Sequence, residues 1–340
     1  MITDNAKCGT CQPVSIIIAA YNEERFIRDK ICSVIDKEYW IEGSEVIVVS
    51  AGSTDNTNVI LNEFGNHRDI VLIIYQEHLS KIEAVNLAVS RSKNAILVFS
   101  DCRQRMKSGS IRNLLYNFSD ASVGTVTATL VNVRGSKVSQ IRTVLNCVAL
   151  AQSKNGSCLN VFGALYAQRK SVYRTIPTDI IFDDLFVVVS TIVQRKRLIQ
   201  EKEAIIYDVD FNRYYNKERL ERLARGLLMF LWNHTALIMQ LPIGCLIRFL
   251  GFKYLKLVCP FLLTMSMACA LYLIIPVISV QIVSVVALLL LIAFGIKGSR
   301  DVICLFVRMN VYFMTAVFKF VCLNRRDTSW RKLELDQLQE

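Results

Sequence analysis

The sequence lacks the cysteine pattern of a disulfide-stapled secreted domain. Its 11 cysteines are odd in number and scattered from Cys8 to Cys322, which favours a reducing compartment. Cys8 and Cys11 form a CxxC, but no second pair follows, and a structural zinc ion needs four ligands. The first residues also lack the apolar run of a secretory signal, so we expect the N-terminal part of the chain to stay in the compartment where it is made.

Acidic residues are also few, because 29 Asp and Glu stand against 40 Lys and Arg, a net charge of +11. Such a charge attracts nucleic acid, anionic lipid headgroups or phosphorylated substrates. The chain has no basic-aromatic pattern or recognised nucleic-acid module, so we expect no nucleic-acid partner. Since 53% of the residues are hydrophobic and 20% are charged, the composition indicates a soluble part joined to a part that contacts membrane lipid.

Short β-branched runs alternate with longer periodic stretches up to about Asp210. Four runs predict strands buried on both faces, as in a parallel sheet: Ser15–Ala20, Glu45–Ser50, Ile70–Tyr75 and Ala95–Ser100. The stretches between them have helical spacing: Glu23–Lys37, Asp55–Phe64 and Ser80–Ser92. Repeated strand–helix–strand units predict an α/β fold with a doubly wound sheet, whose ligands bind beyond the carboxyl ends of the strands.

Long uncharged apolar runs are missing until well after Gly226. Leu257–Ile275 and Val277–Ile296 then each approach the length of about 20 residues that crosses a bilayer. Basic residues flank this pair and are absent from its tip: Lys253, Lys256, Lys297 and Arg300. The positive-inside rule therefore predicts a transmembrane hairpin with both flanks in the cytoplasm.

Two segments beside the hairpin, Leu227–Leu250 and Val302–Leu323, mix apolar and polar residues. Both predict amphipathic helices that lie in the membrane interface. The alternative, three or four spans, would need a buried His234 or Arg308 with a partner. We therefore expect a multi-pass protein of the inner or plasma membrane, with a cytoplasmic catalytic domain over residues 1–225 and a membrane region over residues 226–340.

Polar clusters follow three of the predicted strands, at Ala20–Glu24, Ser50–Thr57 and Ser100–Arg103. Helix capping or turn formation accounts for any one of them, and Asp55 before an apolar helix fits that role. Three clusters at the same edge of one sheet indicate a binding site instead.

These segments, in this order, resemble the inverting family 2 glycosyltransferases of the GT-A fold. The resemblance runs from Pro13 to about Gly226, and six runs carry it: Val14–Glu24, Glu45–Thr57, Ser80–Val89, Ala95–Gln104, Phe162–Lys170 and Phe182–Phe186. It implies a Rossmann-like, mostly parallel sheet followed by C-terminal membrane helices, and a UDP- or GDP-linked sugar as donor. The chain looks like the membrane-attached subgroup that builds exopolysaccharide, capsule or other surface glycans on a lipid-linked or glycan acceptor.

The resemblance also implies roles for single residues. The nucleotide-sugar pocket would use the following residues: Ala20, Tyr21, Asn22, Glu23, Ala51, Gly52, Ser53, Lys81, Ser100, Asp101, Arg103, Arg222 and Arg225. Carboxylate oxygens suit Mg²⁺ or Mn²⁺, and Asp101 is the expected metal ligand. Lys81 and Arg103 would help to neutralise the phosphates, with ordinary surface charge as the alternative.

A carboxylate pair, Asp183 and Asp184, matches the position of the family's catalytic acids. The resemblance implies that Asp184 is the general base and that Asp183 supports it. The alternative is that both only begin a helix over Leu185–Gln194, since acidic side chains stabilise helix N-termini.

The chain departs from the family in three places. Ala51 stands where many relatives carry an Asp that faces the nucleotide, and Asp101-Cys102-Arg103 lacks the second carboxylate of D-x-D. We infer weaker metal dependence, not inactivity. The Q-x-x-R-W sequence of processive synthases is also missing, and Arg222 and Arg225 resemble its nonprocessive counterpart, so we expect one sugar per encounter. The rival interpretation is a catalytically retired nucleotide-binding or scaffold subunit of a glycan-assembly complex.

Overall fold

The computed structural model describes residues 12–36, 40–132, 137–208, 217–274 and 297–323. The chain divides into two compact units. The first comprises Met1–Phe211, Ala236–Pro242 and Thr328–Glu340, and the second comprises Asn212–Thr235 and Ile243–Asp327. The first unit contains the sheet, and the described part of the second is helical.

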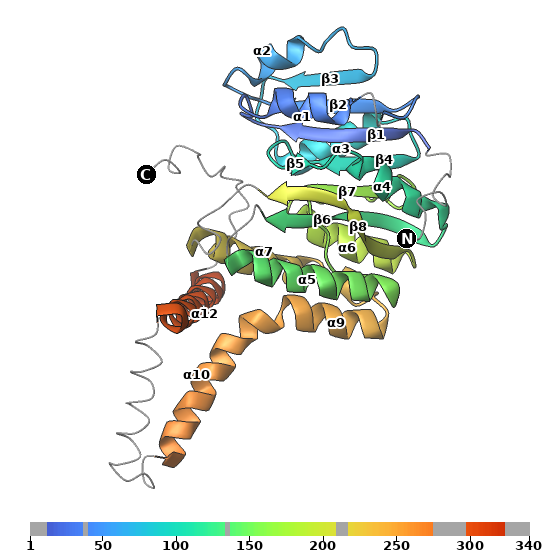
Figure 1. The fold of residues 1–340 in the computed structure, drawn as a ribbon. Helices are drawn as coiled ribbons and strands as arrows, with labels where there is room; N and C mark the ends of the chain where they lie inside the picture. Colours follow the sequence, from blue (N-terminus) through green and yellow to red (C-terminus); the bar gives the residue numbers. More distant parts are fainter. Residues whose placement is uncertain (1–11, 37–39, 133–136, 209–216, 275–296, 324–340) are drawn as a thin grey trace. The chain divides into compact units, whose positions relative to one another are not determined.

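The first unit is built on an eight-stranded sheet with the strand order β3-β2-β1-β4-β7-β6-β8-β5. The strands are β1 (Val14–Ala20), β2 (Glu45–Ala51), β3 (Ile70–Tyr75), β4 (Ile96–Ser100), β5 (Arg105–Met106), β6 (Val123–Asn132), β7 (Leu165–Arg169) and β8 (Arg197–Asp208). Figure 1 shows β3, β2, β1 and β4 side by side in blue to cyan. These four strands are parallel, whereas β7 pairs antiparallel with both β4 and β6. The expected α/β fold with a mixed, mostly parallel sheet is confirmed.

One strand differs from the sequence-based expectation. We expected Ile70–Tyr75 to be buried on both faces, but in β3 only Ile70 is buried, and Val71 and Tyr75 are each 40% exposed. The reason is position, because β3 ends the sheet and pairs with β2 alone. Every residue of β2, by contrast, is buried.

Three helices follow the first three strands, as the spacing predicts. They are α1 (Ile27–Val34), α2 (Thr57–Asn62) and α3 (Lys81–Arg91). With 8 residues, α1 is about half as long as its predicted range, and α2 and α3 are shorter than predicted by a few residues. A capping box fixes the start of α3, where Ser80 Oγ accepts from Glu83 N and Glu83 Oε2 accepts from Ser80 N. The other helices of this unit are α4 (Ser110–Tyr116), α5 (Lys137–Lys154), α6 (Asp183–Val193) and the short α8 (Thr235–Ile238).

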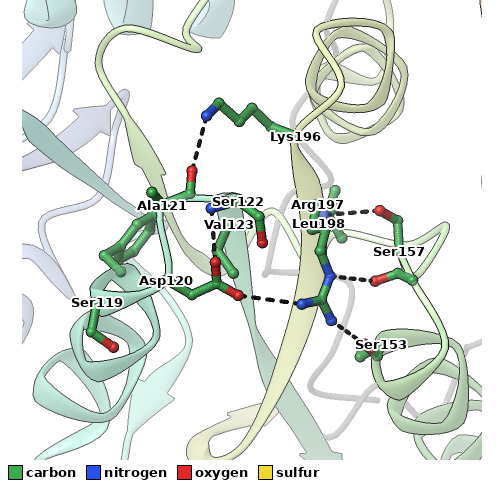
Figure 2. A network of polar contacts seen from close by, with 12 residues as sticks. Ser119, Asp120, Ala121, Ser122, Val123, Ser153, Ser157, Lys196, Arg197 and Leu198 are labelled. Carbon is green, nitrogen blue, oxygen red and sulfur yellow. Dashed lines mark hydrogen bonds and ion pairs between the residues drawn. The ribbon is translucent and has the colours of Figure 1, made fainter.

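A polar network stabilises the amino ends of β6 and β8 (Figure 2). The Arg197 guanidinium contacts Asp120 Oδ2 at 3.3 Å and donates to the carbonyl oxygens of Ser153 and Gly156 at 2.8 and 3.1 Å. Lys196 Nζ donates to Ala121 O at 2.9 Å. The register places these ends at the opposite edge of the sheet from the carboxyl ends of β1 and β4. The network therefore has a structural role, away from the clusters at the strand ends.

In its described residues, the second unit comprises α7 (Lys217–Asn233), α9 (Ile243–Lys253), α10 (Leu255–Ile274) and α12 (Lys297–Leu323). Lys319 Nζ of α12 lies 2.9 Å from Glu221 Oε1 of α7. The segment Leu227–Leu250, expected to be one helix, is divided among α7, α8 and α9, and α9 begins directly after Pro242. Val302–Leu323 does lie within a single helix, α12.

The expected transmembrane hairpin falls mostly outside what the structure describes. Leu257–Ile275 overlaps α10, and Val277–Ile296 lies outside the described residues. Of the helices in the described ranges, none has both the length and the apolar character needed to span a bilayer. The side chains from Val258 to Cys269 are all exposed except that of Pro260.

Candidate functional site

The carboxyl ends of β1 and β2 are joined by hydrogen bonds between their polar clusters. Asn22 N donates to Ser53 Oγ at 3.1 Å, and Asn22 Oδ1 accepts from Thr54 N at 2.8 Å. Glu23 N donates to Thr57 Oγ1 at 2.8 Å. Asn22 adopts φ = +50°, a left-handed conformation that Asn tolerates better than most residues. The two clusters therefore form one rigid edge, as the parallel register requires.

Gly52 allows the second cluster to pass close to the chain after β3. Its φ is +78°, and a Cβ atom there would lie 2.5 Å from the carbonyl oxygen of Glu77. On the same edge the rings of Tyr21 and His78 meet edge to face with centroids 4.5 Å apart. The strand-end residues Ala20, Ala51 and Ser100 are buried, so they form the base of the site.

Lys81 brings two of the candidate acids together. Its Nζ atom lies 3.0 Å from Asp101 Oδ1 and 3.4 Å from Asp183 Oδ2. Asp101 directly follows β4, Asp183 begins α6, and Lys81 begins α3, so three separate elements meet here. Burial alone would lower the pKa of Lys81, but the two carboxylates outweigh it and hold that pKa above its ordinary value. The lysine therefore stays charged.

Arg103 is held in place by Glu23. Its Nε atom donates to both carboxylate oxygens of Glu23, at 3.0 and 3.1 Å. The Glu23 carboxylate is 9% exposed and the Arg103 side chain 18%. Because Glu23 engages Nε, the terminal nitrogens of Arg103 keep their donor capacity. Glu23, assigned by sequence resemblance to the nucleoside pocket, thus holds an arginine in the structure.

Asp184 lies next to Asp183 in the first turn of α6. Its backbone N donates to Asp183 Oδ1 at 3.1 Å, and its own Oδ1 accepts from Leu185 N at 2.8 Å. Both acids are partly exposed. Both acids do begin a helix, as the alternative interpretation expected, since α6 starts at Asp183. Asp183 meets Lys81 as well, so helix initiation is not the whole role of this pair.

Lys30 belongs to this site, and the sequence analysis missed it. It is 3% exposed, and its Nζ donates to Ser100 Oγ at 3.2 Å and to Gln104 O at 2.6 Å. Burial lowers the pKa of its amine, while nearby Cys102 and Asp101 oppose that shift. In the sequence, Lys30 falls on the apolar face of a predicted helix, together with Ile27 and Val34. A charged residue on an apolar face was the signal that the sequence offered.

Two of the predicted site residues, Arg222 and Arg225, lie on α7 in the second unit. The other predicted site residues and their contacts all lie within the first unit.

The donor set at Asp101 fits a divalent cation only in part. Within the described residues, no group of three or more His, Cys, Asp or Glu side chains gathers to hold a metal ion. Asp101 does offer a 34% exposed carboxylate, one oxygen of which contacts Lys81. A hard cation accepts a single protein carboxylate when phosphate oxygens complete its coordination. The residues present thus fit a cation that is shared with a diphosphate.

Comparison with known proteins identifies the domain. The family described as "Glycosyl transferase family 2" matches residues 15–177. This range contains all three strand-end clusters and Lys81. The chain carries a family 2 glycosyltransferase domain.

Two curated relatives match about half of the chain at low identity. The poly-beta-1,6-N-acetyl-D-glucosamine synthase of Staphylococcus aureus (strain COL) is 23% identical over 184 residues, and that of Staphylococcus epidermidis is 24% identical over the same length. Each alignment covers 51% of this chain and 44% of the relative. The chain thus matches less than half the length of these relatives.

A solved structure shares the fold over most of the chain. The mannosyltransferase PcManGT from Pyrobaculum calidifontis, in complex with GDP-Man and Mn²⁺, matches with a TM-score of 0.72 and 22% identity. The match covers 92% of this chain and 88% of that protein. At this identity the likeness establishes the GT-A fold.

The close approach of Gly52 to Glu77 can be tested by comparing alanine substitutions at Gly52 and Gly43. Both have positive φ, +78° and +82°, but a Cβ at Gly43 would make only an ordinary contact with Pro13, at 3.4 Å. We expect Gly43→Ala to cost about 1–2 kcal/mol of unfolding free energy from its backbone conformation alone. Gly52→Ala should cost more, because the chain must also move away from Glu77.

The measurement is thermal unfolding of both variants, together with binding of UDP and GDP. Gly52→Ala should also weaken nucleotide binding, whereas Gly43→Ala should not. Equal losses of stability, with nucleotide binding intact in both variants, would contradict the proposed close approach at Gly52.

Proposed function

We propose that the protein is an inverting glycosyltransferase that moves one sugar at a time from a UDP- or GDP-linked donor to a lipid-linked or glycan acceptor in surface-glycan synthesis. The observation that supports this most strongly is the Lys81 bridge between Asp101 and Asp183. It joins the strand end expected to hold the donor to the helix expected to supply the base. A subunit without catalysis would have no need for these two acids at one cation.

The donor diphosphate would bind beside Asp101, Lys81 and Arg103. The guanidinium of Arg103, held through Nε by Glu23, offers its remaining donors to phosphate oxygens. Asp101 would hold a Mg²⁺ or Mn²⁺ ion, which would neutralise the charge that develops on the leaving diphosphate. The structural relative that carries GDP-Man and Mn²⁺ supports a nucleotide-sugar and a divalent cation for this site.

The acceptor would be activated by Asp184. A carboxylate that accepts the hydroxyl proton allows the acceptor oxygen to attack the anomeric carbon opposite the leaving diphosphate, which inverts that carbon. Asp183 is bound to Lys81 at 3.4 Å. This contact suits Asp183 to the supporting role and Asp184 to proton transfer.

A membrane-bound acceptor fits the character of the second unit. The exposed side chains of α10 between Val258 and Cys269 are apolar or uncharged on every side of the helix. Such a surface is stable in lipid and unfavourable in water. We propose that residues 226–340 attach the catalytic domain, residues 1–225, to the cytoplasmic face of the inner or plasma membrane, through interfacial helices around a hairpin over about 257–275 and 277–296. We also propose membership of the membrane-attached, surface-glycan subgroup of the family.

The proposed activity differs from processive polymerisation in one respect. Two curated relatives are named as synthases of a polysaccharide. This chain has Arg222-Leu-Ala-Arg225-Gly226 where processive synthases carry Q-x-x-R-W. Addition of one sugar per encounter follows from that difference.

A donor screen tests the function. Detergent-purified full chain is incubated with UDP- and GDP-linked sugars, and release of nucleoside diphosphate is measured with and without a membrane lipid extract. The proposal expects release from one donor, increased by the extract. Tight nucleotide binding without release from any donor would favour the retired-subunit interpretation.

Asp101→Asn should abolish most of the transfer while leaving the fold intact, because it removes the expected metal ligand and half of the Lys81 bridge. The measurement is initial rate against Mn²⁺ concentration, with thermal unfolding as the check on folding. Asp29→Asn, on the exposed face of α1, is the matched control and should behave as the parent protein. Full activity of Asp101→Asn, or of the parent in excess chelator, would reject the metal role.

Asp184→Asn should lower kcat by about 10²–10⁴-fold, the usual contribution of a positioned base. Binding of the donor should persist, because the nucleotide would be held at the strand ends. Asp183→Asn should act mainly on donor or metal binding, since Asp183 contacts Lys81. Equal kcat losses in both variants with unchanged donor binding would contradict this division of roles, as would a mild loss in Asp184→Asn.

The membrane arrangement predicts that the hairpin tip is reachable from outside the cell and the C-terminal segment is not. Ser279→Cys and Arg326→Cys, both outside the described residues, are labelled in intact cells with an impermeant thiol reagent. The unsubstituted chain, with its 11 cysteines, gives the background. Label at position 279 but not at 326 is expected, and external labelling at 326 would overturn the two-span arrangement.

A further inference from the structure

Lys81 contacts Asp101, the carboxylate that is expected to hold a divalent cation. Its Nζ lies 3.0 Å from Asp101 Oδ1 and 3.4 Å from Asp183 Oδ2. The three side chains are partly shielded from water, with exposed fractions of 31% for Lys81, 34% for Asp101 and 18% for Asp183. In this setting the ammonium relieves the repulsion between two carboxylates that would otherwise stand close together.

The backbone of Lys81 is fixed, but its charged end is not. The capping box of Ser80 and Glu83 holds the first turn of α3. The lysine side chain then reaches the carboxylates through four methylene groups and carries three rotatable donors. Its ammonium can therefore move by rotation of the side chain alone while α3 stays in place.

A divalent cation and this ammonium cannot share Asp101 Oδ1. Two cations bound to one carboxylate oxygen repel each other strongly in a partly shielded site. Asp101 also lacks the neighbouring acids that would hold a cation by themselves, since no group of three or more metal-binding side chains occurs in the described ranges. Phosphate oxygens must then supply the missing ligands, and the diphosphate in turn offers the ammonium a new partner.

We propose that Lys81 is an exchangeable counterion, which holds Asp101 and Asp183 together in the empty enzyme and moves from Asp101 to the donor diphosphate when a divalent cation enters with the donor. This inference rests on the proposed function and names the order of binding at the same site. It predicts that the empty site excludes the cation and that the cation and the nucleotide bind cooperatively. Lys81 would therefore weaken the binding of the cation alone and strengthen the binding of the nucleotide.

The experiment measures Mn²⁺ and nucleotide binding separately, without turnover. Free Mn²⁺ is followed by electron paramagnetic resonance during titration of the full chain in detergent, with and without UDP or GDP. UDP and GDP binding is then measured by calorimetry in saturating Mn²⁺. Lys81→Met should bind Mn²⁺ alone at least about tenfold more tightly than the parent protein, because the competing charge is gone. The same variant should bind the nucleotide in saturating Mn²⁺ at least about tenfold more weakly, because the ammonium that would contact the diphosphate is gone.

Two variants serve as controls. Lys81→Arg keeps the charge and should exclude Mn²⁺ as the parent does. Lys93→Met removes a 65% exposed lysine whose partner is Glu45, at 3.8 Å, and it should change neither affinity. A purely structural role for Lys81 would weaken both bindings in Lys81→Met and would refute the exchange.

The parent protein alone gives a second test, which does not depend on the folding of any variant. Its affinity for Mn²⁺ should rise by at least about tenfold when UDP or GDP is added. Equal Mn²⁺ affinity with and without nucleotide, in a protein that releases nucleoside diphosphate in the donor screen, would reject the exchange and leave the proposed function standing. Absence of both nucleotide binding and release would reject the two together.

Discussion

The parallel pairing of β1 with β2 and β4 is the constraint on which the site depends. The register Ser15–Glu45 and Val14–Ile96 makes the three strands end at the same edge of the sheet. Segments that are up to 80 residues apart in the chain, such as those of Glu23 and Arg103, therefore come within hydrogen-bond distance. The buried apolar strands stabilise this register, since a shift by one residue would turn the core side chains of each strand to the opposite face.

Hydrogen bonds between the clusters turn this shared edge into a fixed site. Asn22 meets Ser53 and Thr54, and Glu23 meets Thr57 through backbone donors, so the first two clusters hold each other. The buried Lys30 of α1 also donates a hydrogen bond to Ser100, which links α1 to the end of β4. A site built in this way is organised before a ligand arrives, which reduces the entropy lost on binding.

Much of this could be predicted from the sequence because it depends on local patterns. Apolar runs gave the strands β1, β2 and β4 nearly to the residue, and polar clusters after them located the edge where Asp101 lies. The edge position of β3 could not be predicted, since its run Ile70–Tyr75 is as apolar as those of the central strands and only the sheet order distinguishes it. Pairings such as Glu23 with Arg103 also stay hidden, because they depend on which rotamer satisfies a carboxylate in three dimensions.

The charges at the strand ends favour the proposed binding of an added cation, despite a protein charge of +11. Among the described site residues, the acids Glu23, Asp101, Asp183 and Asp184 outnumber the cations Lys30, Lys81 and Arg103, and both Lys81 and Arg103 already have a carboxylate partner. A diphosphate that entered such a site alone would meet cations that already have carboxylate partners and a larger number of acids. In the proposed exchange, Asp101 would hold a cation that arrives with the diphosphate, and the ammonium of Lys81 would then be left for the phosphates. Under this proposal the acids near the site would disfavour a bare nucleotide and favour the metal-bound donor, so the electrostatic arrangement itself would select the form of donor that can react.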